Sequence, residues 1–184
     1  MEYHLDLPVS GEQIRKLKIG DVLYVTGKIF TARDEAHHMM LEKDKKTLSF
    51  DPGEMALFHC GPLMKQTKNK WEVVSAGPTT SSRMEIFEDK FIEKFGVNII
   101  IGKGGMGERT QKALQKHGAV YTAYTGGAGA LAADRVEQVP GVYWLDKLGM
   151  PEAVWIFKVK EFGPLVVAMD SHGESIYQKI ASKS

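Results

Sequence analysis

A run of glycines directly after a buried strand restricts the fold of this chain more than any other feature. Residues 97–101 (VNIII) are rich in β-branched side chains and predict a buried strand, and residues 102–107 (GKGGMG) predict a turn from that strand into a helix. Such a turn leaves backbone N–H groups bare at the positive end of a helix dipole, beside the ammonium of Lys103. This arrangement suits a small anion such as a carboxylate or a phosphate. Glycines at a strand end are also needed for turning alone, so a purely structural role is equally open.

Two common nucleotide-binding loops do not match this turn. In a P-loop the lysine precedes Ser or Thr, whereas Lys103 is followed by Gly104. A dinucleotide fingerprint is expected after the first strand of a chain, and this turn comes much later. The predicted ligand is therefore a small anion and not a nucleotide.

Strand, loop and helix alternate three times between residues 71 and 133. The predicted strands cover residues 71–76, 97–101 and 119–124, and the predicted helices cover residues 85–95, residues 108–117 and a small-residue segment that starts at residue 125. This alternation indicates the α/β class, with a mixed sheet and parallel strand-loop-helix units whose loops gather at one sheet edge. Further strands are predicted at residues 2–7, 22–30, 55–58, 155–160 and 165–170. No repeat or linker divides the chain, so residues 1–184 are expected to form one domain.

An arginine stands at the start of a predicted helix that follows the strand at residues 22–30. Thr31 is the expected N-cap with Asp34 at the capping-box position, and His37 lies one turn further along the same side. Arg33 in the first turn opposes the helix dipole, which favours a role in binding. The alternative is a surface arginine that pairs with a neighbouring carboxylate.

Four consecutive hydroxyl residues precede a second arginine. Residues 79–82 (TTSS) follow a Gly-Pro turn, and Arg83 lies one turn beyond Thr79. A helix N-cap needs only one or two hydroxyls, so the surplus favours a second pocket for an anion.

Charge and cysteine content exclude several classes of function. The chain has 24 Lys and Arg against 23 Asp and Glu, so its charge balance does not indicate nucleic acid or a membrane surface as a partner. A single cysteine, Cys60, excludes an intramolecular disulfide and any multi-cysteine metal or iron–sulfur site in this chain. His59 is expected to be a satisfied buried histidine, so no metal site is predicted. The N-terminal residues lack a signal-peptide pattern and no apolar run is long enough for a membrane span, so a cytoplasmic location is expected.

Four motifs in this order and spacing carry a resemblance to a known family. They are residues 33–37 (RDEAH), 77–84 (GPTTSSRM), 102–106 (GKGGM) and 124–130 (YTGGAGA). Together they resemble the β component of class I fumarate hydratases and L-tartrate dehydratases, in the form that is a separate subunit. The resemblance covers most of the chain and implies a swivelling β/β/α domain.

The resemblance also implies a hydro-lyase whose [4Fe–4S] cluster is held by three cysteines of an α subunit, in agreement with the single cysteine here. Arg33, Arg83 and Lys103 would neutralise a dicarboxylate substrate, with Gly104 beside it and Thr79 near the carbon that gains or loses a proton. A threonine hydroxyl is too weakly acidic to act unaided as a base, so Thr79 would need cationic neighbours or an α-subunit carboxylate. His37 would orient Arg33 or Asp34, with Asp34 and His37 both behind the residues that touch the substrate, and no residue of this chain would bind metal.

The implied reaction is the reversible hydration of fumarate to malate. L-Tartrate dehydration and a non-catalytic module that holds a small anion are the alternatives, because fumarate and tartrate both present two carboxylates at similar separation. The implied assembly contains an α subunit, as an α2β2 complex or another oligomer.

The anion hypothesis makes a geometric prediction. Arg33, Thr79, Arg83 and Lys103 should come from separate turns and converge on one concave surface, with the loop at residues 125–129 alongside. The cations should have no carboxylates between them, because unpaired cations stay together only when a ligand or partner supplies the counter-charge.

Overall fold

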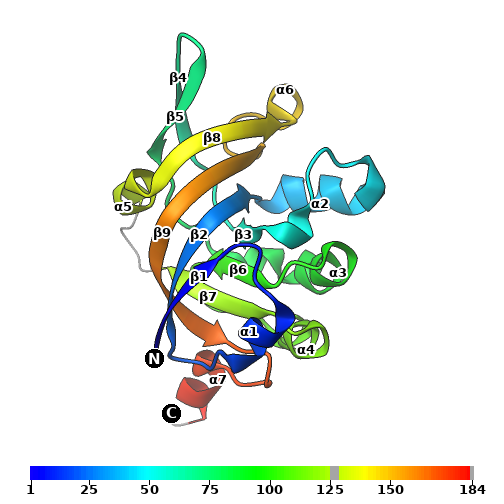
Figure 1. Ribbon diagram of the computed structural model, residues 1–184. Helices are drawn as coiled ribbons and strands as arrows, with labels where there is room; N and C mark the ends of the chain where they lie inside the picture. The colour runs from blue at the N-terminus through cyan, green and yellow to red at the C-terminus, as the bar shows by residue number, and fades with distance from the viewer. Residues whose placement is uncertain (125–128, 183–184) are drawn as a thin grey trace.

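The computed structural model describes residues 1–124 and 129–182, and its centre is a mixed sheet of seven strands in the order β1-β2-β3-β6-β7-β9-β8 (Figure 1). The strands of this sheet are β1 Glu2–Asp6, β2 Val22–Thr31, β3 Ala56–Phe58, β6 Ile99–Gly102, β7 Val120–Tyr124, β8 Val136–Tyr143 and β9 Val154–Met169. Strands β1, β2, β3, β6 and β7 run parallel to one another, and β9 is antiparallel to each of its partners, β2, β7 and β8. The predicted α/β class and mixed sheet are therefore confirmed.

The long strand β9 closes the sheet on itself. Its residue Val166 lies between Val22 of β2 and Ala123 of β7, so both edges of the strand are paired at that point. Since β2, β3, β6 and β7 are already joined side by side, the strands β2, β3, β6, β7 and β9 form a closed ring. The first half of β9 pairs with β8 on the same edge that β7 occupies further along.

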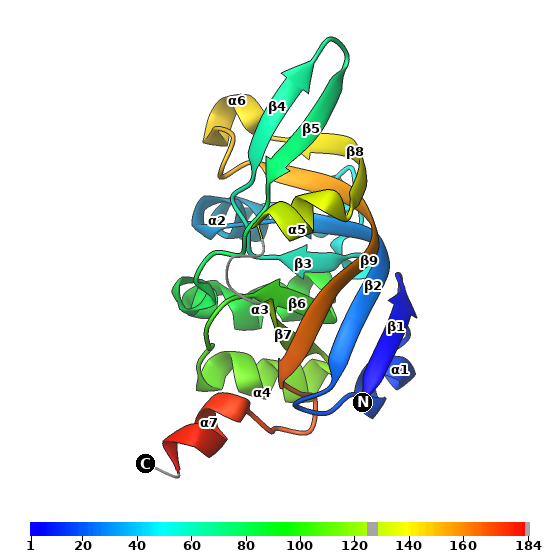
Figure 2. The ribbon, with the colours of Figure 1, turned by 90° about the vertical axis from the view of Figure 1, so that its left-hand side faces the viewer.

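Three helices cover one side of the sheet, stacked one below the other in Figures 1 and 2. The helices and short 3-10 turns are α1 Gly11–Lys16, α2 Asp34–Glu42, η1 Lys45–Thr47, η2 Pro52–Glu54, η3 Ser81–Met84, α3 Glu85–Phe95, α4 Glu108–His117, α5 Gly129–Asp134, α6 Leu145–Leu148 and α7 Ile176–Ala181. Helices α2, α3 and α4 form the covering layer. Helices α3 and α4 end at Gly96 and Gly118, both with φ of +70°, as glycine at a helix C-terminus predicts.

Both faces of the parallel strands are buried. Ile99 and Ile101 of β6 pack into one hydrophobic core, while Ile100 between them packs into a second core with α3 and α4. A strand that is covered on both sides has no polar face, which explains the unbroken apolar run in the sequence. The edge at which β6 ends is consequently held rigidly.

The first predicted strand-loop-helix unit is wrong. The strand at residues 71–76 belongs to a separate antiparallel hairpin, formed by β4 Leu63–Thr67 and β5 Lys70–Ser75, which projects from the end of the molecule opposite α7 (Figure 2). Its residues alternate between exposed and partly buried, as in a strand with one solvated face. In the parallel sheet the neighbour of β6 on this side is the short strand β3 and not the strand at residues 71–76.

Two further expectations fail near β9. The strands predicted at residues 155–160 and 165–170 are one continuous strand that passes through Gly163 and Pro164, and β8 was not predicted. Register shifts in the pairing of β2 with β9 lie beside this proline, which cannot donate a ladder hydrogen bond.

Thr31 does not cap α2. It is the last residue of β2, and its hydroxyl accepts a hydrogen bond from the Trp155 N–H at 3.0 Å and donates to the Ala153 carbonyl at 3.4 Å. The Thr31 hydroxyl is therefore hydrogen-bonded within the sheet and does not cap the helix. Arg33 occupies the N-cap position without a side-chain cap.

Among the described residues, no helix is both long and apolar enough to cross a membrane.

Candidate active site

The carboxyl ends of β2, β3 and β6 lie at one edge of the sheet because these strands are parallel neighbours. Arg33 follows β2, His59 follows β3 and Lys103 follows β6. The segment before η3 adds a further extended piece at this edge, since Thr80 forms a parallel bridge with Lys103 and the Thr79 N–H donates to the His59 carbonyl at 2.8 Å. Turns that are distant in sequence therefore meet here.

A chain of polar contacts joins the second arginine to the start of α2. Arg83 Nη2 donates to Thr79 Oγ1 at 2.9 Å and lies 3.4 Å from Asp34 Oδ2. Asp34 directly follows Arg33 in the sequence, and Thr79 is one residue from the bridge to Lys103. All four residues expected to meet the substrate are thus on neighbouring segments, and their arrangement around one concave surface stays a prediction.

The predicted absence of carboxylates between the cations is wrong for both arginines. Arg33 Nε lies 3.2 Å from Glu152 Oε1, and Arg83 pairs with Asp34. Burial raises the pKa of Glu152, although a backbone N–H and Arg33 act in the opposite direction. Since each guanidinium has its own carboxylate, neither needs an external anion to offset its charge.

Lys103 is the cation that is left for an external anion. It is exposed, and no ion-pair partner lies within reach of it in the described part of the chain. Its neighbour Gly104 has a φ of +76°, and across residues 1–124 and 129–182 nothing hydrogen-bonds to the Gly104 N–H. Among the described residues the N–H groups of Gly105 and Met106 likewise have no hydrogen-bond partner, so the turn offers one ammonium together with the Gly104 N–H and these backbone donors.

The amino end of α4 offers a ligand fewer N–H groups than the glycine run predicts, because Glu85 occupies part of it. The Glu85 carboxylate accepts from the Gly107 N–H at 2.7 Å, from the Thr110 N–H at 3.2 Å and from the Thr110 hydroxyl at 2.6 Å. A carboxylate at this position satisfies the orphan donors and the helix dipole together. The first anion-binding feature of the sequence is thus partly occupied by the chain itself.

Two tyrosines from other elements contact the glycine turn. The Gly104 carbonyl accepts a hydrogen bond from Tyr177 of α7 and lies 3.0 Å from the Tyr121 hydroxyl of β7. The Tyr177 ring lies over Gly105, where a Cβ atom would be 3.2 Å from it. Neither tyrosine carried a recognisable signal in the sequence, because both contacts come from other elements.

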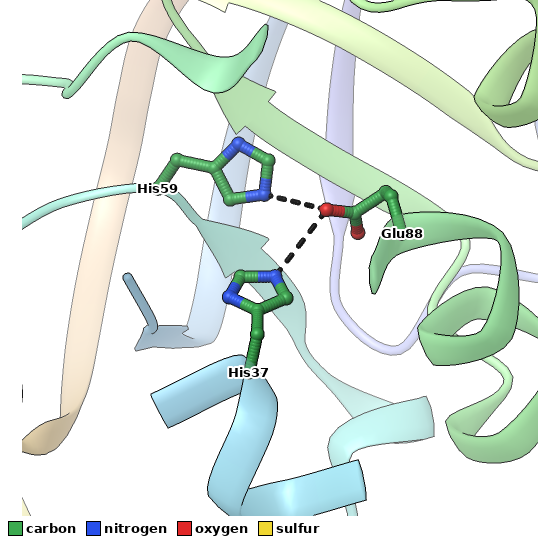
Figure 3. Close-up of side chains that lie close together, drawn as sticks. All are labelled: His37, His59 and Glu88. Carbon is green, nitrogen blue, oxygen red and sulfur yellow. Dashed lines mark hydrogen bonds and ion pairs between the residues drawn. The ribbon is translucent and has the colours of Figure 1, made fainter. Parts of the chain in front are cut away.

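A buried group of two histidines and one glutamate lies beneath the same turns (Figure 3). Glu88 Oε2 is 3.0 Å from His59 Nε2 and 3.3 Å from His37 Nε2, and all three side chains are fully buried. Burial lowers the pKa of His59; burial alone would raise that of Glu88, but the two histidines lower it to about 2. The satisfied buried His59 is as predicted, and His37 contacts the Arg33 carbonyl at 2.8 Å.

Glu88 was missed by the sequence analysis, although a signal was present. It lies three residues before Phe91 and four before Ile92, so it occupies the apolar face of α3. A lone carboxylate on that face requires buried partners. Ser81 was noted only as a possible cap, whereas it is fully buried and contacts His59 Nδ1 at 2.8 Å.

The residues of this chain do not fit an iron–sulfur cluster. Cys60 is the single cysteine, it is fully buried, and burial raises the pKa of its thiol, which disfavours the thiolate that binds iron. The group of His37, His59 and Glu88 has its ligand atoms within 4.8 Å of one another, which is compatible in size with a metal site but supplies only three donors.

Comparison with known proteins identifies the family of this chain. The model of the family described as the fumarase C-terminus matches residues 1–180. The chain belongs to the fumarase C-terminus family. It is 48% identical over 185 residues to a protein of Methanocaldococcus jannaschii named "Putative L(+)-tartrate dehydratase subunit beta", covering all of this chain and 94% of that protein. The resemblance inferred from the four motifs is therefore confirmed.

Two other relatives carry related names. The "L(+)-tartrate dehydratase subunit beta" of Escherichia coli strain K12 is 44% identical over 176 residues, which cover 96% of this chain and 87% of that protein. The "Putative fumarate hydratase class I" of Geobacillus stearothermophilus is 44% identical over 181 residues, 98% of this chain but 34% of that protein. The names of the relatives thus include both hydro-lyase activities.

Proposed function

We propose that this protein is the β subunit of a class I hydro-lyase that reversibly hydrates fumarate to malate. The observation that carries the proposal is Lys103, an exposed ammonium on a glycine turn whose backbone bridges to Thr80, next to the Thr79 that Arg83 contacts, in a member of the fumarase C-terminus family. Arg33, Arg83 and Lys103 would face the two carboxylates of the substrate. Gly104 would add its backbone N–H.

The reaction adds a hydroxyl group to one carbon of the double bond and a proton to the other. Extra negative charge develops on the carboxylate next to the carbon that exchanges the proton, so fixed cations are most useful there. The partial neutralisation of Arg33 by Glu152 and of Arg83 by Asp34 leaves Lys103 with the largest unbalanced charge. Lys103 is therefore the residue on which transition-state stabilisation should depend most.

Thr79 is assigned to the position of proton exchange. Arg83 donates to Thr79 Oγ1 at 2.9 Å, so the hydroxyl proton of Thr79 is free to point away from the arginine toward a substrate. The same guanidinium favours negative charge on Oγ1, but a hydroxyl remains a weak acid, so a carboxylate of the α subunit would complete the proton transfer.

The α subunit would also supply the [4Fe–4S] cluster, since Cys60 alone does not fit one. When bound, that cluster would act as the Lewis acid of the reaction, and the residues of this chain would bind and orient the dicarboxylate. The names of the relatives as β subunits support an α partner, and we place the two chains in an α2β2 complex or another oligomer. Residues 1–184 would act as one domain of the swivelling β/β/α type, which the closed ring of strands supports.

L-Tartrate dehydration is the second candidate, because the Methanocaldococcus jannaschii and Escherichia coli relatives, which this chain spans almost end to end, carry that name. A binding module without chemistry is the third alternative. The experiment is to mix this chain with its α subunit and assay fumarate, malate and L-tartrate. We expect turnover by the pair and none by either chain alone; binding without turnover of any of the three would contradict the enzyme proposal.

A further inference from the structure

The buried group under the active-site turns has one unusual feature: two imidazoles approach the same carboxylate oxygen. His59 Nε2 lies 3.0 Å and His37 Nε2 lies 3.3 Å from Glu88 Oε2 (Figure 3). All three side chains are fully buried, so solvent water does not hydrogen-bond to the ring nitrogens or to the carboxylate. The hydrogen-bond partners on the opposite side of each ring then determine which nitrogens are protonated.

His37 must carry a proton on Nδ1. That atom lies 2.8 Å from the Arg33 carbonyl oxygen, and a carbonyl can only accept a hydrogen bond. In a neutral His37 the lone pair of Nε2 would then face the Glu88 carboxylate, which is repulsive. A second proton on Nε2 turns this contact into an ion pair, and the part of the chain that the structure describes offers Nε2 no other partner.

A neutral His59 satisfies both of its contacts with one proton. Burial lowers its pKa, and a single proton on Nε2 is enough to donate to Glu88. Nδ1 then accepts from the Ser81 hydroxyl at 2.8 Å. The lone pairs of Ser81 Oγ face the Lys103 N–H at 3.2 Å and the Tyr121 hydroxyl at 3.0 Å, whose single proton points either to Ser81 or to the Gly104 carbonyl. With the Tyr121 proton on Ser81, both lone pairs of Oγ are used, so the Ser81 proton points to His59 Nδ1.

We propose that Glu88 is a positioning residue which holds His37 as an imidazolium and His59 as the neutral Nε2–H tautomer, and thereby fixes the two turns that carry Arg33 and Lys103. The contacts run without a break from the Arg33 carbonyl through the three buried side chains to Ser81 and the Lys103 backbone. The catalytic consequence rests on the function proposed above; the protonation pattern does not.

A proton between these groups fits better than a metal ion. Closed structural zinc sites use four ligands, whereas this group has three and is fully buried. The net charge of one carboxylate, one imidazolium and one neutral imidazole is zero, which suits a buried site. Asp34 is a further charged group that acts on His59.

The direct test is nitrogen NMR of the full chain labelled with ¹⁵N-histidine, with the signals of the six histidines assigned by single substitutions. Near neutral pH we expect both ring nitrogens of His37 to be protonated, and His59 to be protonated at Nε2 alone. An unprotonated Nε2 in His37, an Nδ1–H tautomer of His59, or one equivalent of tightly bound zinc on both rings would overturn the proposal.

The substitution Glu88→Gln removes the charge but keeps the shape of the side chain. We expect His37 to lose its Nε2 proton, and the α–β pair to show a KM for fumarate or L-tartrate raised by roughly 10-fold or more with a smaller change in kcat, because displaced binding groups weaken substrate positioning. The control Glu42→Gln alters an exposed carboxylate of α2 that pairs with His38 and should change neither readout.

The outcomes separate this proposal from the function on which its second half rests. Unchanged KM in a folded Glu88→Gln variant of an active pair would refute the positioning role. If the pair turns over none of the three substrates, the histidine signals of the wild-type chain still decide the protonation pattern. If Glu88→Gln does not fold, those same wild-type signals remain decisive.

Discussion

Single residues differ at this site in whether their charge is already offset within the chain. Arg33 and Arg83 each lie within 3.4 Å or less of a carboxylate, whereas Lys103 has no such partner among the residues that the structure describes. An exposed lysine between glycines has few packing contacts to lose. Its charge is therefore more important for a bound anion than for the stability of the fold.

We expect Lys103→Met to reduce kcat/KM of the α–β pair by roughly 100-fold, because a fixed donor to developing charge typically contributes this much. The free energy of unfolding should change by less than about 0.5 kcal/mol, as for other exposed substitutions. Steady-state kinetics and thermal unfolding measure the two effects. The control Lys112→Met removes an exposed lysine paired with Glu108 and should leave both unchanged; equal kinetic losses in the two variants would contradict the assignment.

The buried Glu88 and His59 predict a loss of stability in acid. The Glu88 pKa of about 2 lies below its ordinary value of 4.5, so its stabilisation is complete above pH 4.5 and disappears as the pH falls toward 2. The His59 pKa is lowered from 6.5, so the unfolded chain binds a proton more readily and stability starts to decline below pH 6.5. The Tm of the wild-type chain should therefore fall below pH 6.5, and more steeply below pH 4.5. Glu88→Gln should show a shallower fall below pH 4.5, to which Asp21 and Asp89 still contribute because their pKa values are also lowered. An identical slope in both proteins would refute the prediction.

At the scale of elements, the glycine turn is braced by a helix from the far end of the chain. The Tyr177 hydroxyl of α7 donates to the Gly104 carbonyl, and its ring covers Gly105. On the other side, Glu85 at the start of α3 satisfies the amino end of α4. The turn therefore holds its shape through contacts with α3 and α7 and not through its own side chains.

Tyr177→Phe should destabilise the chain by about 1 kcal/mol, the net contribution of one hydrogen bond. The loss should be local, so amide hydrogen exchange should accelerate at residues 103–107 more than elsewhere. The matched control is Tyr143→Phe, because the Tyr143 hydroxyl has no hydrogen-bond partner among the described residues. If exchange in the turn is unaltered in Tyr177→Phe, α7 does not brace it.

At the scale of the whole molecule, closure of the strands by β9 joins the helix-covered sheet to β8 and the projecting hairpin. This leaves the carboxyl ends of β2, β3 and β6 at one rigid edge, to which the hairpin connection returns at Thr79 and Thr80. A site built on such an edge keeps its geometry when the partner subunit is absent. Only the contributions of the partner are then missing.

The chain purified alone should be folded, colourless and free of iron, because Cys60 is single and buried. Iron analysis and the visible absorption spectrum test this. Iron–sulfur absorbance in a stoichiometric amount would refute the division of labour between the two subunits. The same measurement on the α–β pair should show the cluster and serves as the positive control.

The sequence by itself determined the local structure around β6 and α4 and the residue types at the carboxyl ends of the strands. β-Branched runs, glycine C-caps and i, i+4 patterns act over a few residues, so strand β6, helices α3 and α4 and the positions of Arg33, Thr79, Arg83 and Lys103 were predictable. The four motifs also identified the family, which the comparisons confirm. The loop at residues 125–128, expected alongside the site, lies outside the described residues.

Only the tertiary structure decided which of these charges is free. The pairing of Arg33 with Glu152 and the satisfaction of α4 by Glu85 join residues far apart in sequence, and no periodic pattern encodes them. The same holds for the placement of β5 in a hairpin outside the main sheet and for the buried Glu88. The physical reason is that helix and strand formation depend on neighbouring residues, whereas charge pairing depends on distances that exist only after β9 has closed the sheet.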